Sequence, residues 1–155
     1  MDMQAEMGTH ARVTIRRPGG DLIIWIRYDG SVCALGTQLC ELIRVLLATK
    51  PTGYWQTHIN NMTASRDGLP LSFDSGDQLM EVFTRREYNT YANDECTDIE
   101  YEYLICFTKR YLAVSSKGRP GNIAGVKLSF DNIIAGRNIE EFTLSSRDLS
   151  RHNDV

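Results

Sequence analysis

Residues 11–50 read ARVTIRRPGGDLIIWIRYDGSVCALGTQLCELIRVLLATK, and this stretch decides the fold. Val13 and Ile15 alternate with polar residues at the period of two that is typical of a half-buried strand. The Pro-Gly-Gly-Asp segment at 18–21 then favours a chain reversal, because proline presets its own φ and glycine tolerates a positive φ. A return strand over 22–28 completes the predicted β-hairpin. Both of its faces carry large apolar side chains, which indicates either a central strand covered on both sides or an apolar face met by a partner.

The hydrophobic period changes after the Asp29-Gly30 pair. Leucine and isoleucine recur from Leu35 to Leu47 at helical spacing, which predicts a helix with one buried face. Gly36 falls in the first turn, where glycine costs about 1 kcal/mol relative to alanine. We therefore expect close backbone packing there, or a helix start that must leave room for something. The helix should end before Pro51, because the residue before a proline is pushed out of the α region.

The remaining sequence predicts one more helix and three more strands. A helix is expected over 73–87, and alternating residues predict a hairpin over 99–116 and a strand over 125–130. These elements predict an α+β fold: a mostly antiparallel sheet of about five to six strands with two helices packed on one face. Residues 9–144 should form this single domain, between a flexible N-terminus (1–8) and a polar C-terminal tail (145–155).

Composition narrows the class of protein. The 155 residues carry a formal net charge of −3, which argues against direct DNA binding through bulk positive charge. No apolar run approaches the ~20 residues that span a bilayer, and the first residues lack the features of a signal peptide. We therefore expect a cytoplasmic protein with no membrane association.

The four cysteines do not form a recognisable site. They lie at Cys33, Cys40, Cys96 and Cys106, with no Cys-x-x-Cys pair and no histidine at ligand spacing. Free, partly buried thiols are the expectation, and neither a metal nor another cofactor is predicted.

Several short motifs follow one another in an informative order. Met7-Gly8-Thr9 precedes the hairpin, Tyr28-Asp29-Gly30 ends it, and Gly36 and Leu39 follow without a gap. The chain resembles a family of small uncharacterised phage, plasmid and bacterial proteins with a Met-Gly-Thr-Arg opening. In that family an Asp-Gly-Tyr-Pro-x-Gly-x-Gly turn leads from the hairpin into a Leu-rich helix.

The resemblance extends over residues 7–116. The segments 74–79 and 99–103 are similar to the family's second helix start and its Glu-Tyr-x-Tyr strand. His10 replaces the opening arginine, and Ser31, Val32 and Ala34 replace the Tyr, Pro and first Gly of the turn. The resemblance implies a mobile-element context and no known reaction. It also implies that Met7 is the ancestral start and that residues 1–6 are an extension.

The densest chemical feature is acidic and aromatic. Carboxylates and tyrosines crowd residues 94–103, and such a surface steers a basic partner while tyrosine supplies rigid contact area. A solvated loop and strand face is the alternative interpretation. The functional hypothesis is a phage- or mobile-element-encoded protein that inhibits a host defence or nucleic-acid-handling protein. Its expected partner-binding residues are Asp94, Glu95, Asp98, Glu100, Tyr101, Glu102 and Tyr103.

A second hypothesis is a nucleotide-type small-molecule binder or a small enzyme. It uses the turn at 29–36 together with a separate basic patch at the second hairpin. No catalytic motif supports the enzyme, since there is no nucleophile elbow and no phosphate loop. The ligand-binding candidates are Tyr28, Asp29, Gly36, His58, Lys109, Arg110 and Arg119. A third possibility is a structural subunit of a larger assembly.

Overall fold

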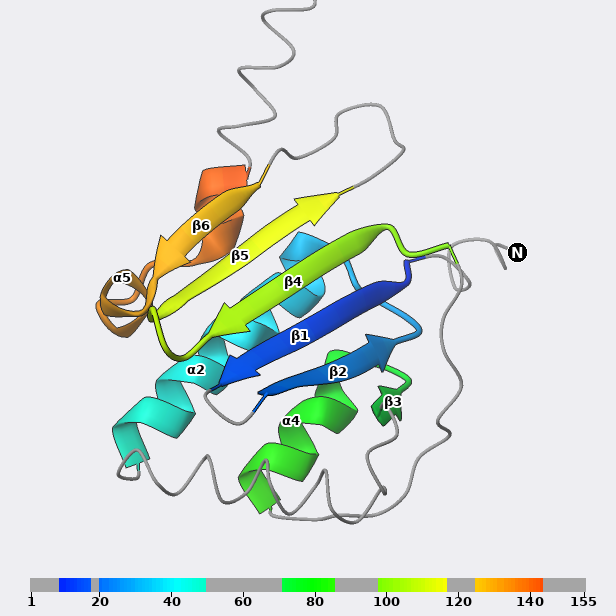
Figure 1. Ribbon diagram of the computed structural model, residues 1–155, viewed down its shortest axis with the longest axis horizontal. Coiled ribbons are helices and arrows are strands. Elements are labelled where there is room, and N and C mark those ends of the chain that lie inside the picture. Colours follow the sequence, from blue (N-terminus) through cyan, green and yellow to red (C-terminus); the bar gives the residue numbers. More distant parts are fainter. Residues whose placement is uncertain (1–8, 18–19, 50–70, 86–97, 117–124, 144–155) are drawn as a thin grey trace, which may run out of the picture.

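The computed structural model describes residues 9–17, 20–49, 71–85, 98–116 and 125–143. One sheet of six strands forms the frame, with the strands in the order β3-β2-β1-β4-β5-β6 (Figure 1). The strand bounds are β1 Ala11–Arg17, β2 Gly20–Ile26, β3 Leu71–Phe73, β4 Tyr101–Cys106, β5 Tyr111–Ser116 and β6 Val126–Ser129. The predictions made for 1–8 and 145–155 fall outside the described residues.

The sheet is mixed, so the prediction of a mostly antiparallel sheet is wrong, although the α+β class is confirmed. Pairs β1–β2, β4–β5 and β5–β6 are antiparallel, whereas β1–β4 and β2–β3 are parallel. The reason is that helices separate β2 from β3 and β3 from β4 along the chain. A strand that follows such a helix can return in the same direction as its neighbour, which a tight hairpin does not allow.

The described residues contain four helical elements with defined bounds rather than the two that were predicted. They are the π-helix η1 Val32–Gly36 and the α-helices α2 Thr37–Thr49, α4 Gly76–Arg85 and α5 Phe130–Ile134. Residues 139–143 are helical as well. The additional elements are only about one turn long, too short for a hydrophobic period to reveal.

The core lies between the sheet and the helices. Alternation along β1 turns Val13 and Ile15 inward, and both are at most 2% exposed. The predicted helical stripe meets them, since Leu39 and Ile43 are buried in the same cluster. In Figure 1, α2 and α4 lie together behind the sheet. The predicted hairpin and the buried face of the helix over 35–47 are therefore confirmed.

The turn that follows β2 is closely packed at Gly30. A Cβ on this residue would lie 2.7 Å from the Cβ of Ala11 and 2.9 Å from the carbonyl oxygen of Thr9. The backbone N–H of Gly30 donates to that Thr9 oxygen, and the hydroxyl of Tyr103 donates to the Gly30 carbonyl at 2.7 Å. Gly30 thus ties the hairpin to β4.

Gly36 is also closely packed, although less tightly than Gly30. A Cβ there would lie 3.1 Å from Cγ1 of Val32 and 3.2 Å from Cγ2 of Ile139. Of the two expectations for Gly36, the structure therefore supports close packing.

Arg44 attaches α2 to the C-terminal elements. Its guanidinium donates to the carbonyl oxygens of Ile133 at 2.8 Å and Arg137 at 3.0 Å, and it pairs with Glu41 at 3.1 Å. The Ile133 carbonyl also accepts from the Gly136 backbone N–H at 3.0 Å, and Arg137 lies just beyond the end of α5, so Arg44 adds side-chain hydrogen bonds to this C-terminal segment. The helices are therefore held together on one side of the sheet.

Candidate functional site

The second face of the sheet carries none of the helices in the described residues, and it faces the viewer in Figure 1. We call it the helix-free face. Strand alternation turns the residues that do not face the helices toward it, and the register aligns these side chains in three rows across the sheet. The first row is Ser72, Trp25, Arg12, Glu102 and Ser115; the second is Ile23, Thr14, Leu104, Ala113 and Lys127; the third is Asp21, Arg16, Cys106, Tyr111 and Ser129.

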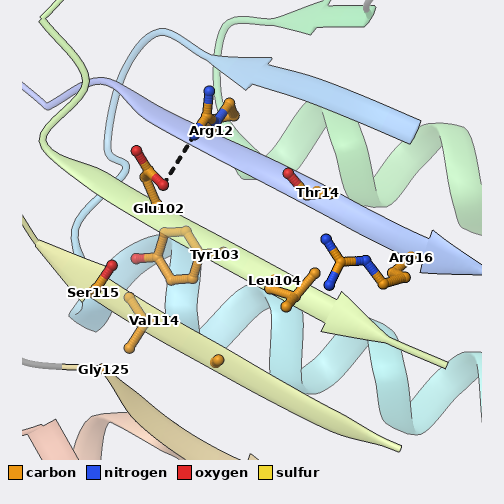
Figure 2. A pocket seen from close by; sticks show the side chains of 10 residues that line it. Arg12, Thr14, Arg16, Glu102, Tyr103, Leu104, Val114, Ser115 and Gly125 are labelled. Carbon is orange, nitrogen blue, oxygen red and sulfur yellow. Dashed lines mark ion pairs between the residues drawn. The ribbon is translucent and has the colours of Figure 1, made fainter. Parts of the chain in front are cut away.

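The middle of the helix-free face is hollowed. The hollow has a volume of about 330 Å³ and lies over β1, β4 and β5. The space exists because Thr14 and Ala113, in the second row, have small side chains, whereas the first and third rows carry longer side chains on either side of them. Figure 2 shows the hollow, which is lined by Arg12, Thr14, Arg16, Glu102, Tyr103, Leu104, Ala113, Val114, Ser115 and Gly125.

Two guanidinium groups from β1 flank the hollow. Arg12 and Arg16 are four residues apart on one strand, so their Cα atoms lie about 13 Å apart along it. Arg12 pairs with Glu102 at 3.0 Å, and this pair is the dashed line in Figure 2. Arg16 pairs with Asp21 at 3.3 Å, and the hydrogen bond with that carboxylate raises the pKa of the Arg16 guanidinium. Both cations remain partly exposed, since 37% and 51% of their side-chain surfaces are accessible.

Aromatic rings lie on both sides of the hollow. The Arg12 guanidinium carbon is 5.8 Å from the centre of the Trp25 ring, on the β2 side. The Lys127 ammonium is 4.6 Å from the centre of the Tyr111 ring, on the side of β5 and β6. Each cation lies within the distance at which the ring quadrupole attracts it. The helix-free face thus combines paired cations, aromatic rings and a hollow that both polar and apolar groups line.

Strand alternation separates the residues of the acidic, tyrosine-rich surface expected from the sequence. Tyr103 is 2% exposed and Tyr101 packs against the core, so both rings lie on the helix side of β4. Their ring centres are 6.4 Å apart. Glu102 points to the opposite face and pairs with Arg12. The four residues Glu100, Tyr101, Glu102 and Tyr103 therefore do not share one surface.

The three remaining acidic candidates can be placed only in part. Asp98 is exposed and has a φ of 54°, before the start of β4. Asp94 and Glu95 lie outside the described residues.

The ligand-binding candidates from the second hypothesis are not brought together either. Tyr28 and Asp29 follow β2 at the end of the sheet where Ala11 pairs with Ile26. Lys109 and Arg110 lie in the β4–β5 turn at the other end, where Arg16 pairs with Cys106. Gly36 is buried in the packing described above. His58 and Arg119 fall outside the described residues.

The cysteines of the described ranges are free thiols. Cys33 is exposed, whereas Cys40 and Cys106 are buried. Burial raises the pKa of the Cys40 thiol, so the neutral form is favoured there. Within the same ranges no three His, Cys, Asp or Glu side chains gather as metal ligands would. No helix in the described part of the chain is long and apolar enough to cross a membrane.

Of the residues that line the hollow, Glu102 and Tyr103 were among the predicted partner-binding residues, and the others were missed by sequence reasoning although their signal was present. Arg12, Thr14 and Arg16 are the polar half of the alternation that predicted β1. Ser115 and Ala113 hold the corresponding positions on β5. What the sequence lacked was the parallel pairing of β1 with β4, which brings these two sets together.

The sequence and the fold were compared with protein families, curated proteins and solved structures. No family model, no curated protein and no solved structure matches the chain.

Proposed function

We propose that the protein binds a small phosphate-bearing ligand of the nucleotide class in the hollow on the helix-free face. The observation that carries this proposal is the pair of arginines, Arg12 and Arg16, that flanks the hollow from one strand. A guanidinium presents a planar fork of N–H donors that matches two phosphate oxygens at once. Phosphate is therefore a group that these side chains can bind with two hydrogen bonds each.

The remaining lining suits the rest of a nucleotide. Leu104 and Ala113 supply an apolar floor on which a flat ring can lie. The hydroxyls of Thr14 and Ser115 and the carboxylate of Glu102 supply hydrogen-bonding partners for sugar hydroxyls and base edges. A volume of about 330 Å³ lies at the lower end of the range for small-molecule sites, about 300–1,000 Å³, so the hollow suits a single nucleotide unit.

The ion pairs explain how the cations stay in place without a ligand. Each guanidinium faces a carboxylate, Glu102 or Asp21, and partly exposed pairs of this kind contribute only about 0.2–1 kcal/mol. A phosphate that offers two oxygens can replace such a partner at little cost. This proposal moves the nucleotide site of the second hypothesis from the turn at 29–36 to the helix-free face.

The test compares AMP with adenosine by isothermal titration calorimetry and thermal shift. AMP should bind, and adenosine, which lacks the phosphate, should bind at least about tenfold more weakly, because a bidentate charged contact contributes more than 1 kcal/mol. At one hundred times its Kd, AMP should raise the free energy of unfolding by about 2.7 kcal/mol.

Arg16→Gln and Arg137→Gln form a matched pair of variants. Each removes one cation from an exposed ion pair, and the two side chains are 51% and 49% accessible, but Arg137 does not line the hollow. Arg16→Gln should weaken AMP binding about tenfold, and Arg137→Gln should leave it unchanged. Equal binding of AMP and adenosine, or equal effects of the two variants, would reject the proposal.

A further inference from the structure

Two polar atoms beside the hollow have no hydrogen-bond partner. Trp25 Nε1 and Ser72 Oγ are buried and unpaired, in side chains that are 9% and 2% exposed. The third such atom among the described residues, Gln38 Oε1, belongs to a residue of the helix layer whose amide nitrogen donates to Asp77. Buried polar atoms normally find a partner, and leaving one without costs about 1–3 kcal/mol. A cross-strand pair that leaves two such atoms together therefore calls for an explanation.

The register places this pair next to the hollow. Ser72 pairs with Trp25, and Trp25 pairs with Arg12, whose guanidinium lines the hollow. These three residues continue the first row beyond the hollow, onto β2 and β3. Neighbouring strands lie about 4.8 Å apart, so Ser72 is about 10 Å from Arg12 across the sheet. A mononucleotide that fills the hollow does not extend that far.

We propose that the natural ligand is a single-stranded oligonucleotide, and that Trp25 and Ser72 form a second subsite for the nucleotide next to the one in the hollow. This inference rests on the proposed function. Trp25 Nε1 is a donor and the Ser72 hydroxyl is both donor and acceptor, so they fit the acceptor atoms of a phosphate, a sugar or a base edge. The indole ring adds a stacking surface that accepts any base.

Arg12 controls access to this subsite. Its guanidinium lies over the Trp25 ring at 5.8 Å and is held by Glu102 at 3.0 Å. Trp25 and Ser72 are 9% and 2% exposed with the guanidinium in this position, so the second subsite requires that a phosphate in the hollow draws the guanidinium away from the indole and that both side chains become accessible. Occupation of the hollow thus prepares the second subsite, and binding of two linked units is favoured over binding of one.

A single strand fits this face better than a duplex. Stacking on Trp25 and contact with its N–H both need a base that has left its own stack, as in sheet-based recognition of single strands. Tyr111, whose ring makes a cation–π contact with Lys127 beyond the other side of the hollow, offers a second ring to a longer strand.

The experiment uses a Trp55→Phe variant of the full chain, in which Trp25 is the only tryptophan, because the sequence holds two. Its fluorescence is followed during titration with AMP, with the 5′-phosphorylated dinucleotide pApA, and with single-stranded and duplex hexanucleotides. We expect pApA to bind at least about tenfold more tightly than AMP and to change the Trp25 emission more strongly. The duplex should bind more weakly than the single strand.

Ser72→Ala in the same background isolates the second subsite. It should weaken pApA binding about three- to tenfold, the usual range for one hydrogen bond, and leave AMP binding unchanged. Trp25→Phe, followed by calorimetry, keeps a ring but removes the N–H and should behave in the same way. A urea titration of each variant shows that it is folded.

The outcomes separate the two proposals. Equal affinities for AMP and pApA with no effect of Ser72→Ala would overturn the second subsite and leave the mononucleotide site intact. Equal affinities for single strand and duplex would overturn the single-strand assignment. No binding of any of these probes would overturn the proposed function itself, and the inference with it.

Discussion

The hydrogen bond between Tyr103 and Gly30 offers the sharpest test of how the sheet is held together. Tyr103 is 2% exposed, and its hydroxyl donates to the Gly30 carbonyl oxygen at 2.7 Å. Tyr103→Phe keeps the ring and removes the donor, so a buried carbonyl loses its partner. That loss costs about 1–3 kcal/mol. Urea unfolding followed by circular dichroism at pH 7 should therefore show this decrease in the free energy of unfolding.

The same residue predicts a dependence on alkaline pH. Burial is the main cause that raises the pKa of Tyr103 well above its usual value, and a smaller contribution comes from Tyr101. The unfolded chain then loses its Tyr103 proton near pH 10 while the folded chain keeps it. Stability from this group is complete below that pH and falls as the pH rises further, by about 1.4 kcal/mol per pH unit. The Phe variant lacks this proton. The difference in the free energy of unfolding between the wild type and this variant should therefore shrink above pH 10.

The control is Tyr28→Phe, because Tyr28 is 40% exposed. A surface change of this kind alters stability by no more than about 0.5 kcal/mol. If Tyr103→Phe is as stable as the Tyr28 control at pH 7, or if its disadvantage stays constant up to pH 11, the role given to the buried hydroxyl is incorrect.

Three further predictions concern other parts of the molecule. Gly30→Ala should destabilise the fold by about 1–3 kcal/mol in urea unfolding, because its Cβ would meet Ala11 at 2.7 Å; a neutral effect would contradict the close packing at this turn. Asp21→Asn should raise the affinity for AMP about two- to fivefold in calorimetry, because Arg16 no longer has to leave a carboxylate; weaker binding would mean that Asp21 itself contacts the ligand. Hydrogen bonds from the Arg137 side chain and the Asn138 backbone N–H lower the pKa of Glu141. The stability that the Glu141 carboxylate gives to the fold is therefore present above pH 4.5 and lost as the pH falls through the lowered pKa. Glu141→Gln should therefore unfold more readily than the wild type at pH 7, and the difference should disappear as the pH falls below the lowered pKa.

The sequence predicted the elements whose pattern is local and long enough to repeat. The hairpin of β1 and β2, the helix that contains Leu39 and Ile43, and the strands β4, β5 and β6 all follow from hydrophobic period. The class α+β followed from their order. The alternation along a strand predicts on which face of the sheet each side chain lies. This is why Val13 and Ile15 were placed correctly in the core.

The pairing between distant strands could not be predicted in the same way. β3 has three residues, too few for a period, and it joins β2 in parallel. The parallel pairing of β1 with β4 brings together residues about 90 positions apart, such as Arg12 and Glu102. Sequence reasoning grouped Tyr101, Glu102 and Tyr103 because they are adjacent in the chain. Successive side chains of a strand point to opposite faces of the sheet, so residues that are adjacent in the chain do not form one surface.

The charge of the helix-free face limits the way in which a nucleic acid can be held there. The three rows carry three cations, Arg12, Arg16 and Lys127, and two carboxylates, Asp21 and Glu102. A chain with a net charge of −3 cannot draw a polyanion from a distance, so the affinity must come from a few direct guanidinium contacts. Each phosphate contact to a single strand contributes about −0.7 to the slope of log K against log salt concentration. With both arginines engaged the slope should stay near −1.4, far shallower than that of proteins that bind nucleic acid through bulk charge.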